Sequence, residues 1–362
     1  MIRPCEADSA AQGFQVAGEF VGAAPFGSGH INDSFRIEFR EGGSLESYLL
    51  QRINTRVFTD HVALMQNMER VTSHIARQVA DAPDHARRVL ALIPSKDDRS
   101  FHIDASGGCW RMMRFIEGTQ ALERIDSPQQ AFQVAATFGR FQQQLASLPP
   151  PRLNDTIPDF HNTVMRFRAL EKAIESDEAN RVQFADSEIA FALERKAMTS
   201  VLLDADLPER IAHNDTKSSN VLLDDVTGEG LCVIDLDTVM PGLALYDFGD
   251  MVRSMASSAA EDERDLSRID LQFPVFEALV RGYLETAGDL LTTREKQLLA
   301  FSGKLITFEN GLRFLSDYLS GDVYYKVHRQ GHNLDRCRAQ FKLVESIERQ
   351  EERMNQLVDT LT

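Results

Sequence analysis

The sequence predicts an α+β protein with two lobes, a small N-terminal lobe rich in antiparallel strands and a larger, mainly helical lobe. Up to about residue 115, short apolar segments with period-two alternation are separated by glycine turns, as in β-hairpins. Farther on, apolar residues mostly recur at helical spacing, and 362 residues are enough for two such units. We therefore expect lobes at 1–116 and 117–362.

The first lobe should begin with a hairpin followed by a helix. Segment 20–26 is apolar, 34–39 alternates as SFRIEF, and the turn EGGS leads into YLLQRIN at 48–54. Further strands are expected at 100–103 and 109–116. A helix is expected between the hairpin and these strands, with Asp60 as its N-cap. It carries an apolar stripe formed by Leu64, Met68, Val71, Ile75 and Val79.

The second lobe should be helical except around one hairpin. Helical spacing covers 128–148, 160–174 and 187–203, and most of the chain after residue 266. The hairpin strands are expected at 221–223 and 231–237.

Composition excludes several classes of protein. With 43% hydrophobic and 26% charged residues, the chain is of the ordinary globular type. A net charge of −16 argues against non-specific nucleic-acid binding, which requires cationic surface. No apolar run is long enough to span a membrane, the N-terminus has no secretory pattern, and the four cysteines are far apart. We expect a cytoplasmic protein without membrane or nucleic-acid partners; the sequence leaves its oligomeric state open.

One polar loop between apolar segments carries the strongest chemical signal. In IAHNDTKSSNVLL (211–223), His213, Asp215 and Asn220 have the spacing H-x-D-x-x-x-x-N. In the catalytic loop of protein kinases, the Asp of this pattern accepts the proton of the substrate hydroxyl and the Asn binds a metal ion. His213 itself is more simply explained as a support for the loop.

Two acidic residues follow the loop along the chain, where they could hold the metal ion of a phosphoryl transfer. IDLDT places Asp235 and Asp237 at the end of an apolar strand, about twenty residues after Asp215. A carboxylate there suits Mg²⁺ bound to ATP phosphates. The later YDFGD also contains the letters DFG, but it follows PGLAL rather than a strand, so we interpret Asp247 as a structural residue that caps a helix or braces the loop.

The first lobe offers weaker signals for nucleotide binding. PFGSGHINDSF has Gly27, Ser28 and Gly29 in a turn that is suited either to phosphate contacts or to a plain hairpin, with Asn32 where a third glycine would stand. The strand that carries a phosphate-binding Lys in protein kinases has Gln51 and Arg52 instead, and either Arg52 or the metal and backbone would have to serve. Glu69 is either a partner of such a cation or part of a solvated helix face.

These motifs together resemble the aminoglycoside phosphotransferase and choline kinase superfamily, small-molecule kinases with a protein-kinase-like fold. GSGHIN, LLQRINTRVF, HNDTKSSNVLLD, VIDLDTVMPG and GLRFLSDYLSGDVYY resemble, in the same order, the N-acetylhexosamine 1-kinases. Segments 31–35 and 326–331 depart from that family. The resemblance implies transfer of phosphate from ATP, with Mg²⁺, to the anomeric hydroxyl of N-acetylglucosamine or N-acetylgalactosamine.

The resemblance also implies roles for particular residues. Asp215 is the expected base, and Asn220 and Asp235 are the expected metal ligands. The glycine turn with Gln51 or Arg52 would contact the nucleotide phosphates, and backbone groups near Arg114 and Ile116 would meet adenine. The expected substrate contacts, besides Asp215, are His30, Asp237, Arg313 and Tyr324.

Helical spacing supports Arg313 in part. Glu309, Arg313 and Asp317 form a polar stripe on an otherwise apolar helix, which fits either surface ion pairs or a sugar site. Tyr324 would stack on a sugar or simply pack. Two other functions remain open: an aminoglycoside, choline or homoserine-type kinase on the same scaffold, and a catalytically inactive kinase-like binding module.

Overall fold

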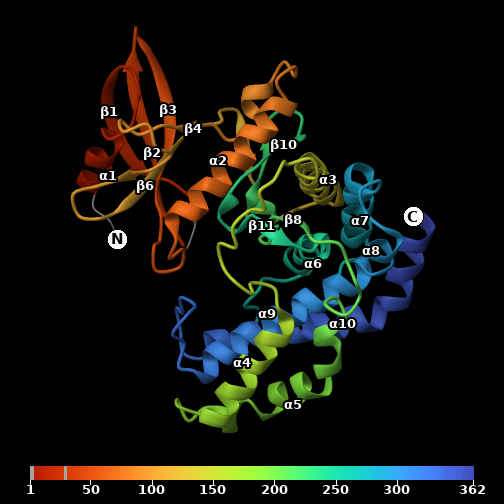
Figure 1. Ribbon diagram of the computed structural model, residues 1–362. Coiled ribbons are helices and arrows are strands. Elements are labelled where there is room, and N and C mark those ends of the chain that lie inside the picture. Colours follow the sequence, from red (N-terminus) through yellow and green to blue (C-terminus); the bar gives the residue numbers. More distant parts are fainter. Residues whose placement is uncertain (1–3, 28–30) are drawn as a thin grey trace.

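The computed structural model describes residues 4–27 and 31–362 and confirms the predicted α+β architecture. An antiparallel sheet forms the N-terminal lobe, and helices form most of the C-terminal lobe (Figure 1). Among the described residues, no helix is long and apolar enough to cross a membrane.

The N-terminal sheet has the strand order β1-β2-β3-β6-β4, and β5 pairs with β6. All its pairings are antiparallel, and Gln51 of β3 lies opposite Arg111 of β6. The predicted hairpin segments correspond to the first three strands. The bounds are β1 Glu19–Pro25, β2 Asp33–Glu41, β3 Ser44–Arg52, β4 Leu92–Ile93, β5 His102–Ile103 and β6 Cys109–Arg114.

The two faces of this sheet are covered by different helices. Helix α1 (Pro4–Ala11) lies on one face, where Phe35, Leu50 and Trp110 are buried. The opposite face joins α2 (His61–Gln78), whose apolar stripe enters the main core shared with the C-terminal lobe. As predicted, Asp60 caps α2, accepting a hydrogen bond from the Ala63 N–H.

The connection between the lobes follows β6 directly. Strand β7 (Thr119–Ala121) pairs with β9 of the C-terminal lobe, so the chain changes sheets between residues 114 and 119. The Pro-rich segment at 147–158 contains no helix or strand. The other strands are β8 Arg210–Ala212, β9 Val221–Asp224, β10 Gly230–Val233 and β11 Met240–Gly242.

Helices α3 and α7 pack closely in the C-terminal lobe, and α9 packs with α4, α6 and α10 (Figure 1). The bounds are α3 Pro128–Leu145, α4 Thr163–Ser176, α5 Asp186–Glu194, α6 Ala244–Met255, α7 Phe273–Ala287, α8 Thr293–Gln297, α9 Leu299–Leu319 and α10 His332–Leu361.

Two predicted elements are shorter than expected. The helix predicted at 187–203 ends at Glu194 and continues as the 3₁₀-helix Lys196–Ser200. The strand predicted at 231–237 ends at Val233, because Asp235 adopts a left-handed backbone conformation and a 3₁₀ turn follows at Leu236–Thr238. This turn changes the directions of the Asp235 and Asp237 side chains.

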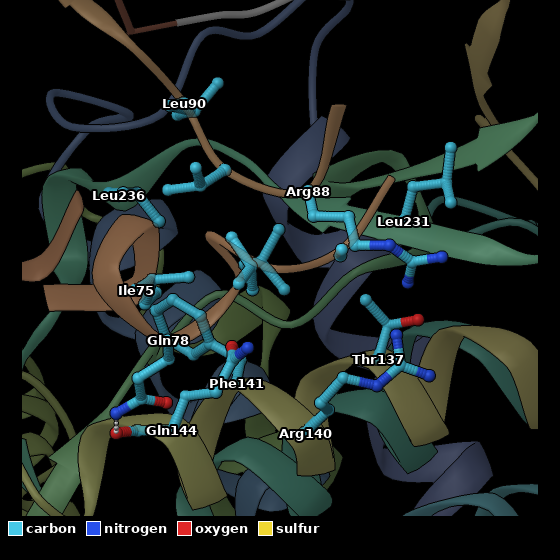
Figure 2. A pocket seen from close by; sticks show the side chains of 14 residues that line it. Ile75, Gln78, Arg88, Leu90, Thr137, Arg140, Phe141, Gln144, Leu231 and Leu236 are labelled. Atoms are coloured by element: carbon cyan, nitrogen blue, oxygen red, sulfur yellow. Dashed lines mark hydrogen bonds between the residues drawn. The ribbon is translucent and has the colours of Figure 1, made fainter. Parts of the chain in front are cut away.

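A cavity of about 250 Å³ lies between α2, α3 and β10 (Figure 2). Its walls are apolar at Ile75, Phe141 and Leu236, with Arg88 and Arg140 at one side. Asp215, Asn220 and Asp235 do not line it, so this cavity is separate from the predicted catalytic residues.

Helices α3 and α7 pack so closely that a larger residue at Gly282 should destabilise the protein. A methyl group there would overlap the backbone carbonyl of Phe132, which cannot rotate away. We expect Gly282→Ala to lower the free energy of unfolding by about 1–3 kcal/mol, as overpacked cores do. Urea denaturation would measure this, with Gly22→Ala as control, since a methyl group at Gly22 meets nothing within 4 Å. Equal midpoints for Gly282→Ala and the wild type would contradict it.

Candidate active site

The polar loop at 213–220 joins β8 to β9 and is largely buried. Asn214 adopts a left-handed conformation, with φ of 66°, which Asn tolerates better than most residues. Its side chain donates to the carbonyl oxygens of Ala212 and Thr238 at 3.2 and 2.8 Å. The side chain of Asn214 thereby fixes the backbone turn directly before Asp215.

The side chain of Asp247 on α6 holds the backbone of this loop in place. Its buried carboxylate accepts hydrogen bonds from the backbone N–H groups of His213 and Asn214, at 2.9 and 2.7 Å, and from the Gln142 amide at 2.7 Å. One turn later on α6, Asp250 accepts from the Thr216 N–H at 2.8 Å. The interpretation of Asp247 as a bracing residue is confirmed.

His213 also supports the loop from inside. Its ring is fully buried, edge-on to Phe138 and Phe141. Nε2 lies 2.9 Å from the Ile234 carbonyl oxygen, and the Asp215 N–H points to Nδ1 at 3.3 Å. His213 therefore connects the loop to the strand that precedes the acidic pair.

The Asp215 carboxylate is accessible and paired. About 30% of the side chain is exposed, and its Oδ2 lies 2.9 Å from Lys217 Nζ and 3.0 Å from Asn220 Nδ2. Burial opposes ionisation, but the Lys217 ammonium holds the pKa of Asp215 below its ordinary value. An ionised, accessible carboxylate is suited to orient a hydroxyl and accept its proton.

Asn220 and Asp235 supply oxygen atoms that suit Mg²⁺. The Asn220 amide nitrogen donates to the backbone oxygen and the carboxylate of Asp215, which leaves the amide oxygen as the acceptor on its other side. Although part of Asp235 is accessible, the surrounding protein and the carboxylates of Asp237 and Asp215 raise its pKa to about 6. A bound cation would relieve this repulsion.

Across the part of the chain that the structure describes, no group of three or more His, Cys, Asp or Glu residues is arranged to hold a metal ion. Magnesium that shares its coordination with nucleotide phosphates and water needs only one or two protein carboxylates. The donor set of Asn220 and Asp235 therefore fits such an ion.

Asp237 has a different environment from Asp235. It is buried, and its carboxylate accepts from Asn32 Nδ2 at 2.6 Å and from Arg111. Its backbone oxygen accepts from the Thr156 hydroxyl at 2.9 Å. Because protein donors occupy both carboxylate oxygens, the expected substrate contact of Asp237 does not fit this structure, in which Asp237 joins the two lobes.

Arg111, which the sequence reasoning did not select, provides the buried cation of this region. Its guanidinium donates twice to Gln51 Oε1, at 2.9 and 2.8 Å, and pairs with Asp237. The Gln51 amide nitrogen donates to the Ser34 hydroxyl at 3.0 Å. The signal that was missed is the alternation of β6, which puts Arg111 opposite Gln51 on the face toward α2.

Arg52 lies on the other face of the sheet. It contacts Glu6 at 3.8 Å and lies over the Trp110 ring, on the side covered by α1. The proposal that Arg52 grips phosphates does not fit this placement, because neighbouring strand residues point to opposite faces. Glu69 is exposed on α2.

The remaining nucleotide candidates lie around β1 and the connection between the lobes. Gly27 has a positive φ of 79°, while Ser28, Gly29 and His30 lie outside the described residues. Arg114 is exposed and lies 3.4 Å from Glu46. Ile116 is buried in the connection, where its carbonyl accepts from the Thr119 hydroxyl at 2.8 Å. Their contacts with a nucleotide stay predictions.

A cluster of two arginines and two aromatic rings lies beside the catalytic loop. The Arg313 guanidinium is 5.1 Å from the Phe160 ring and 5.9 Å from the Tyr325 ring, and Arg166 donates to the Phe160 carbonyl oxygen at 2.7 Å. His161, the neighbour of Phe160, contacts the Asn214 backbone oxygen at 3.0 Å. We call Phe160, Arg166, Arg313 and Tyr325 the arginine–aromatic cluster.

The polar stripe on α9 is not a row of surface ion pairs. Glu309 is fully buried against His161, and Asp317 accepts from the backbone N–H groups of residues 323–325. Asp317 thereby shapes the segment that carries Tyr324 and Tyr325. Tyr324 is 59% exposed, so of these two rings Tyr325 is the one that meets Arg313.

Comparison with known proteins gives the family of this chain. Residues 22–288 match the model of the phosphotransferase enzyme family, APH, which covers most of the chain and includes the loop and acidic pair just described. The protein belongs to this family, and it is a small-molecule phosphotransferase.

Several solved structures share its fold. An aminoglycoside phosphotransferase from Alicyclobacillus acidocaldarius is 12% identical with a TM-score of 0.60, covering 100% of this chain and 95% of that one. A microcompartment-associated aminopropanol kinase is 16% identical with a TM-score of 0.57, at 97% and 98% coverage. Plasmodium vivax ethanolamine kinase is 16% identical with a TM-score of 0.56, at 94% and 84% coverage. At these identities the likeness extends to the fold alone.

The buried pair of Arg111 and Asp237 predicts a marked effect on stability. Arg111→Met leaves the Asp237 carboxylate buried without its cation, which should lower the free energy of unfolding by about 3–5 kcal/mol. Adding Asp237→Asn removes the stranded charge and should restore part of this loss. Urea denaturation of both variants would measure the coupling, with Arg281→Met, on an exposed pair, as control. Additive losses in the double variant would contradict a direct pair.

Proposed function

We propose that the protein is an ATP- and Mg²⁺-dependent kinase that phosphorylates the anomeric hydroxyl of N-acetylglucosamine or N-acetylgalactosamine. The reaction type rests on the family and on the grouping of Asp215, Asn220 and Asp235. The observation that carries the acceptor class is the arginine–aromatic cluster beside Asp215. Sequence resemblance to the N-acetylhexosamine 1-kinases supports the particular sugar.

In this proposal Asp215 performs the proton chemistry. Its carboxylate orients the acceptor hydroxyl, whose oxygen attacks the terminal phosphorus of ATP as the bond to the ADP oxygen breaks, and it accepts the released proton. Lys217 keeps Asp215 ionised, and Asn220 fixes the rotation of the carboxylate. Asn220 and Asp235 would hold Mg²⁺, which, when bound, neutralises phosphate charge.

The nucleotide would lie between the sheet and the catalytic loop. The turn after β1, with Gly27, Ser28 and Gly29, supplies backbone N–H groups for phosphates, and the segment with Arg114 and Ile116 supplies the adenine contacts. Arg111 and Gln51 replace the strand lysine of protein kinases as the polar pair on the inner face of the sheet. His30 and Tyr324 remain proposed sugar contacts.

The arginine–aromatic cluster favours an oxygen-rich acceptor over a cationic one. Among the described residues, neither Arg166 nor Arg313 has a carboxylate within ion-pair distance, and burial together with the positive charge of Arg313 lowers the pKa of Arg166. The Glu309 carboxylate acts on both arginines without an ion-pair contact, and an ammonium group placed here would still meet two positive charges. Hydroxyl and amide oxygens of an N-acetylated sugar would instead accept hydrogen bonds from the guanidinium groups, and the rings offer apolar surface to the sugar.

The competing substrates come from the structural neighbours. These neighbours include a spectinomycin phosphotransferase, a choline kinase, an ethanolamine kinase and an aminopropanol kinase. The third possibility, an inactive binding module, is disfavoured because Asp215, Asn220 and Asp235 are all present and lie close together.

An acceptor panel tests the function directly. ADP release from Mg-ATP would be measured with N-acetylglucosamine, N-acetylgalactosamine, glucose, kanamycin and choline. We expect turnover with an acetylated hexosamine, and Asp215→Asn should lower it by at least about 10²-fold because the base is removed. Turnover with kanamycin or choline alone would overturn the sugar assignment, and an active Asp215→Asn enzyme would overturn the role of Asp215. Failure to bind Mg-ATP would favour the inactive module.

A second prediction concerns the acceptor side. Arg313→Met should raise the acceptor KM about tenfold, the loss expected for one charge-assisted hydrogen bond, with the KM for Mg-ATP unchanged. Steady-state kinetics with each substrate varied in turn would measure the two constants, with Arg281→Met as control. An unchanged acceptor KM would remove Arg313 from the acceptor site.

A further inference from the structure

His161 lies between the catalytic loop and helix α9, and the mechanism above does not use it. Its Nδ1 lies 2.8 Å from Glu309 Oε1, and its Nε2 lies 3.0 Å from the backbone oxygen of Asn214. The second Glu309 oxygen accepts from the Thr163 hydroxyl at 2.6 Å. His161, Glu309 and Thr163 are all buried. This chain of contacts reaches from α9 to the peptide group directly before Asp215.

The partners of His161 determine the protonation of its ring. A backbone carbonyl oxygen can only accept, so His161 Nε2 donates to Asn214. If Glu309 is ionised, its carboxylate also accepts, and the ring then carries both protons. The loop contains a contrasting histidine. His213 faces the Ile234 carbonyl oxygen with Nε2 but receives the Asp215 N–H at Nδ1, so one nitrogen donates and the other accepts. His161 and His213 thus hold the same loop through different hydrogen-bond patterns.

We propose that His161 is a positioning residue, held as an imidazolium by Glu309, which fixes the peptide group before Asp215 and couples it to helix α9. The inference rests on the proposed role of Asp215 but not on the identity of the acceptor.

The geometry of the loop explains why this contact matters. Asn214 has a positive φ, and both peptide groups that flank it are held: Asp247 accepts from the N–H of the first, and the carbonyl oxygen of the second accepts from His161. Glu309 stands one turn before Arg313 on α9. The ion pair therefore sets the spacing between the base and the arginine–aromatic cluster. Errors of about 1 Å in such spacing are enough to slow reactions by about 10²-fold.

The charges around His161 favour the cation. Burial opposes the charged ring, but the Glu309 carboxylate, the Asn214 carbonyl and Asp250 on α6 raise the pKa of His161 above its ordinary value. Burial likewise opposes ionisation of Glu309, while His161, Arg313 and the Thr163 hydroxyl hold its pKa below the ordinary value. The other titratable groups facing the pair are Tyr246 of α6, in contact with the ring, and Arg166 of α4.

These shifts define a pH window. The raised pKa of His161 stabilises the fold fully below its ordinary value of 6.5, and this contribution is lost as the pH rises through the folded pKa. The lowered pKa of Glu309 contributes fully above its ordinary value of 4.5 and is lost as the pH falls through the folded pKa. Both contributions are therefore complete between pH 4.5 and 6.5, and the ion pair weakens as the pH rises through the folded pKa of His161 or falls through that of Glu309.

The protonation state can be measured on the wild-type protein. With ring-labelled ¹⁵N-histidine, nine imidazoles contribute signals, and His161 is assigned by the loss of its signal in His161→Gln or by its displacement in Thr163→Val. At pH 6.5, the ordinary pKa of a histidine, we expect both His161 nitrogens to carry protons. A His161 ring with a single proton at this pH overturns the proposal.

The positioning role is tested with Glu309→Gln, which keeps the size of the side chain and removes the charge. We expect kcat to fall about tenfold or more with the KM for Mg-ATP within about twofold, and hydrogen exchange of the loop at 213–220 to accelerate. The matched control is Glu188→Gln, which removes a buried carboxylate 2.7 Å from Arg338, away from the loop. Lower stability with wild-type kcat in Glu309→Gln would reduce the pair to a structural role and overturn the proposal.

The two proposals can fail separately. If no acceptor supports turnover, the proposed function fails, while the ring protonation and the exchange rate of the loop still decide the role of His161. If Asp215→Asn is inactive but Glu309→Gln matches the wild type in kcat and loop exchange, the function stands and the positioning role is wrong.

Discussion

The buried carboxylate of Asp237 is the contact on which the relation between the two lobes depends. It receives Asn32 from the turn after β1 and Arg111 from β6, while its own backbone is tied to Thr156. Both donors to the carboxylate come from the sheet or its turns, so an acidic residue of the C-terminal lobe ties the sheet to the region of the loop at 213–220. A buried charge of this kind requires its partners, since an unpaired carboxylate in the interior is costly. The absence of a lysine on β3 is compatible with this arrangement, because Arg111 already brings a cation to the inner face of the sheet, with Gln51 as its hydrogen-bond acceptor.

The catalytic loop is held in the same way, by charged groups that bind its backbone. Asp247 takes two successive N–H groups, Asp250 takes a third, and His161 reaches the carbonyl of the same segment. Backbone groups buried without partners would cost free energy, so each of these contacts is also required for folding. The consequence is a rigid support under a side chain, Asp215, that remains partly exposed. The buried contacts thus lie beneath Asp215, whose side chain stays accessible together with that of Lys217.

Much of this arrangement could be predicted from the sequence because it depends on local patterns. The hairpin alternation, the Asp60 cap and the spacing within 213–220 are short-range signals, and the structure contains the corresponding elements.

Contacts between residues far apart along the chain could not be predicted in this way. Arg111 lies in an ordinary strand, and only its register with Gln51 shows which way it points. Gln51 and Arg52 were both open as replacements for the lysine, and strand alternation turns Arg52 away. His161 lies in an irregular segment far from its partners along the chain, and no local pattern signals a contact with Glu309. The left-handed Asp235, which ended a predicted strand early, is a further case in which the site overrides local propensity.

The separation between the loop and the arginine–aromatic cluster has a consequence for the diversity of such proteins. The groups assigned to phosphoryl transfer lie on the β8–β9 and β10–β11 connections, whereas Arg166, Arg313 and Tyr325 lie on α4, α9 and the segment after it (Figure 1). His161 is one connection between the two sets, since it contacts both Asn214 and Glu309. Mutational libraries restricted to the second set would leave the reaction machinery intact while exploring new acceptors, provided that His161 and Glu309 are kept constant. The architecture thus allows the arginine–aromatic cluster to vary while the groups assigned to phosphoryl transfer stay the same.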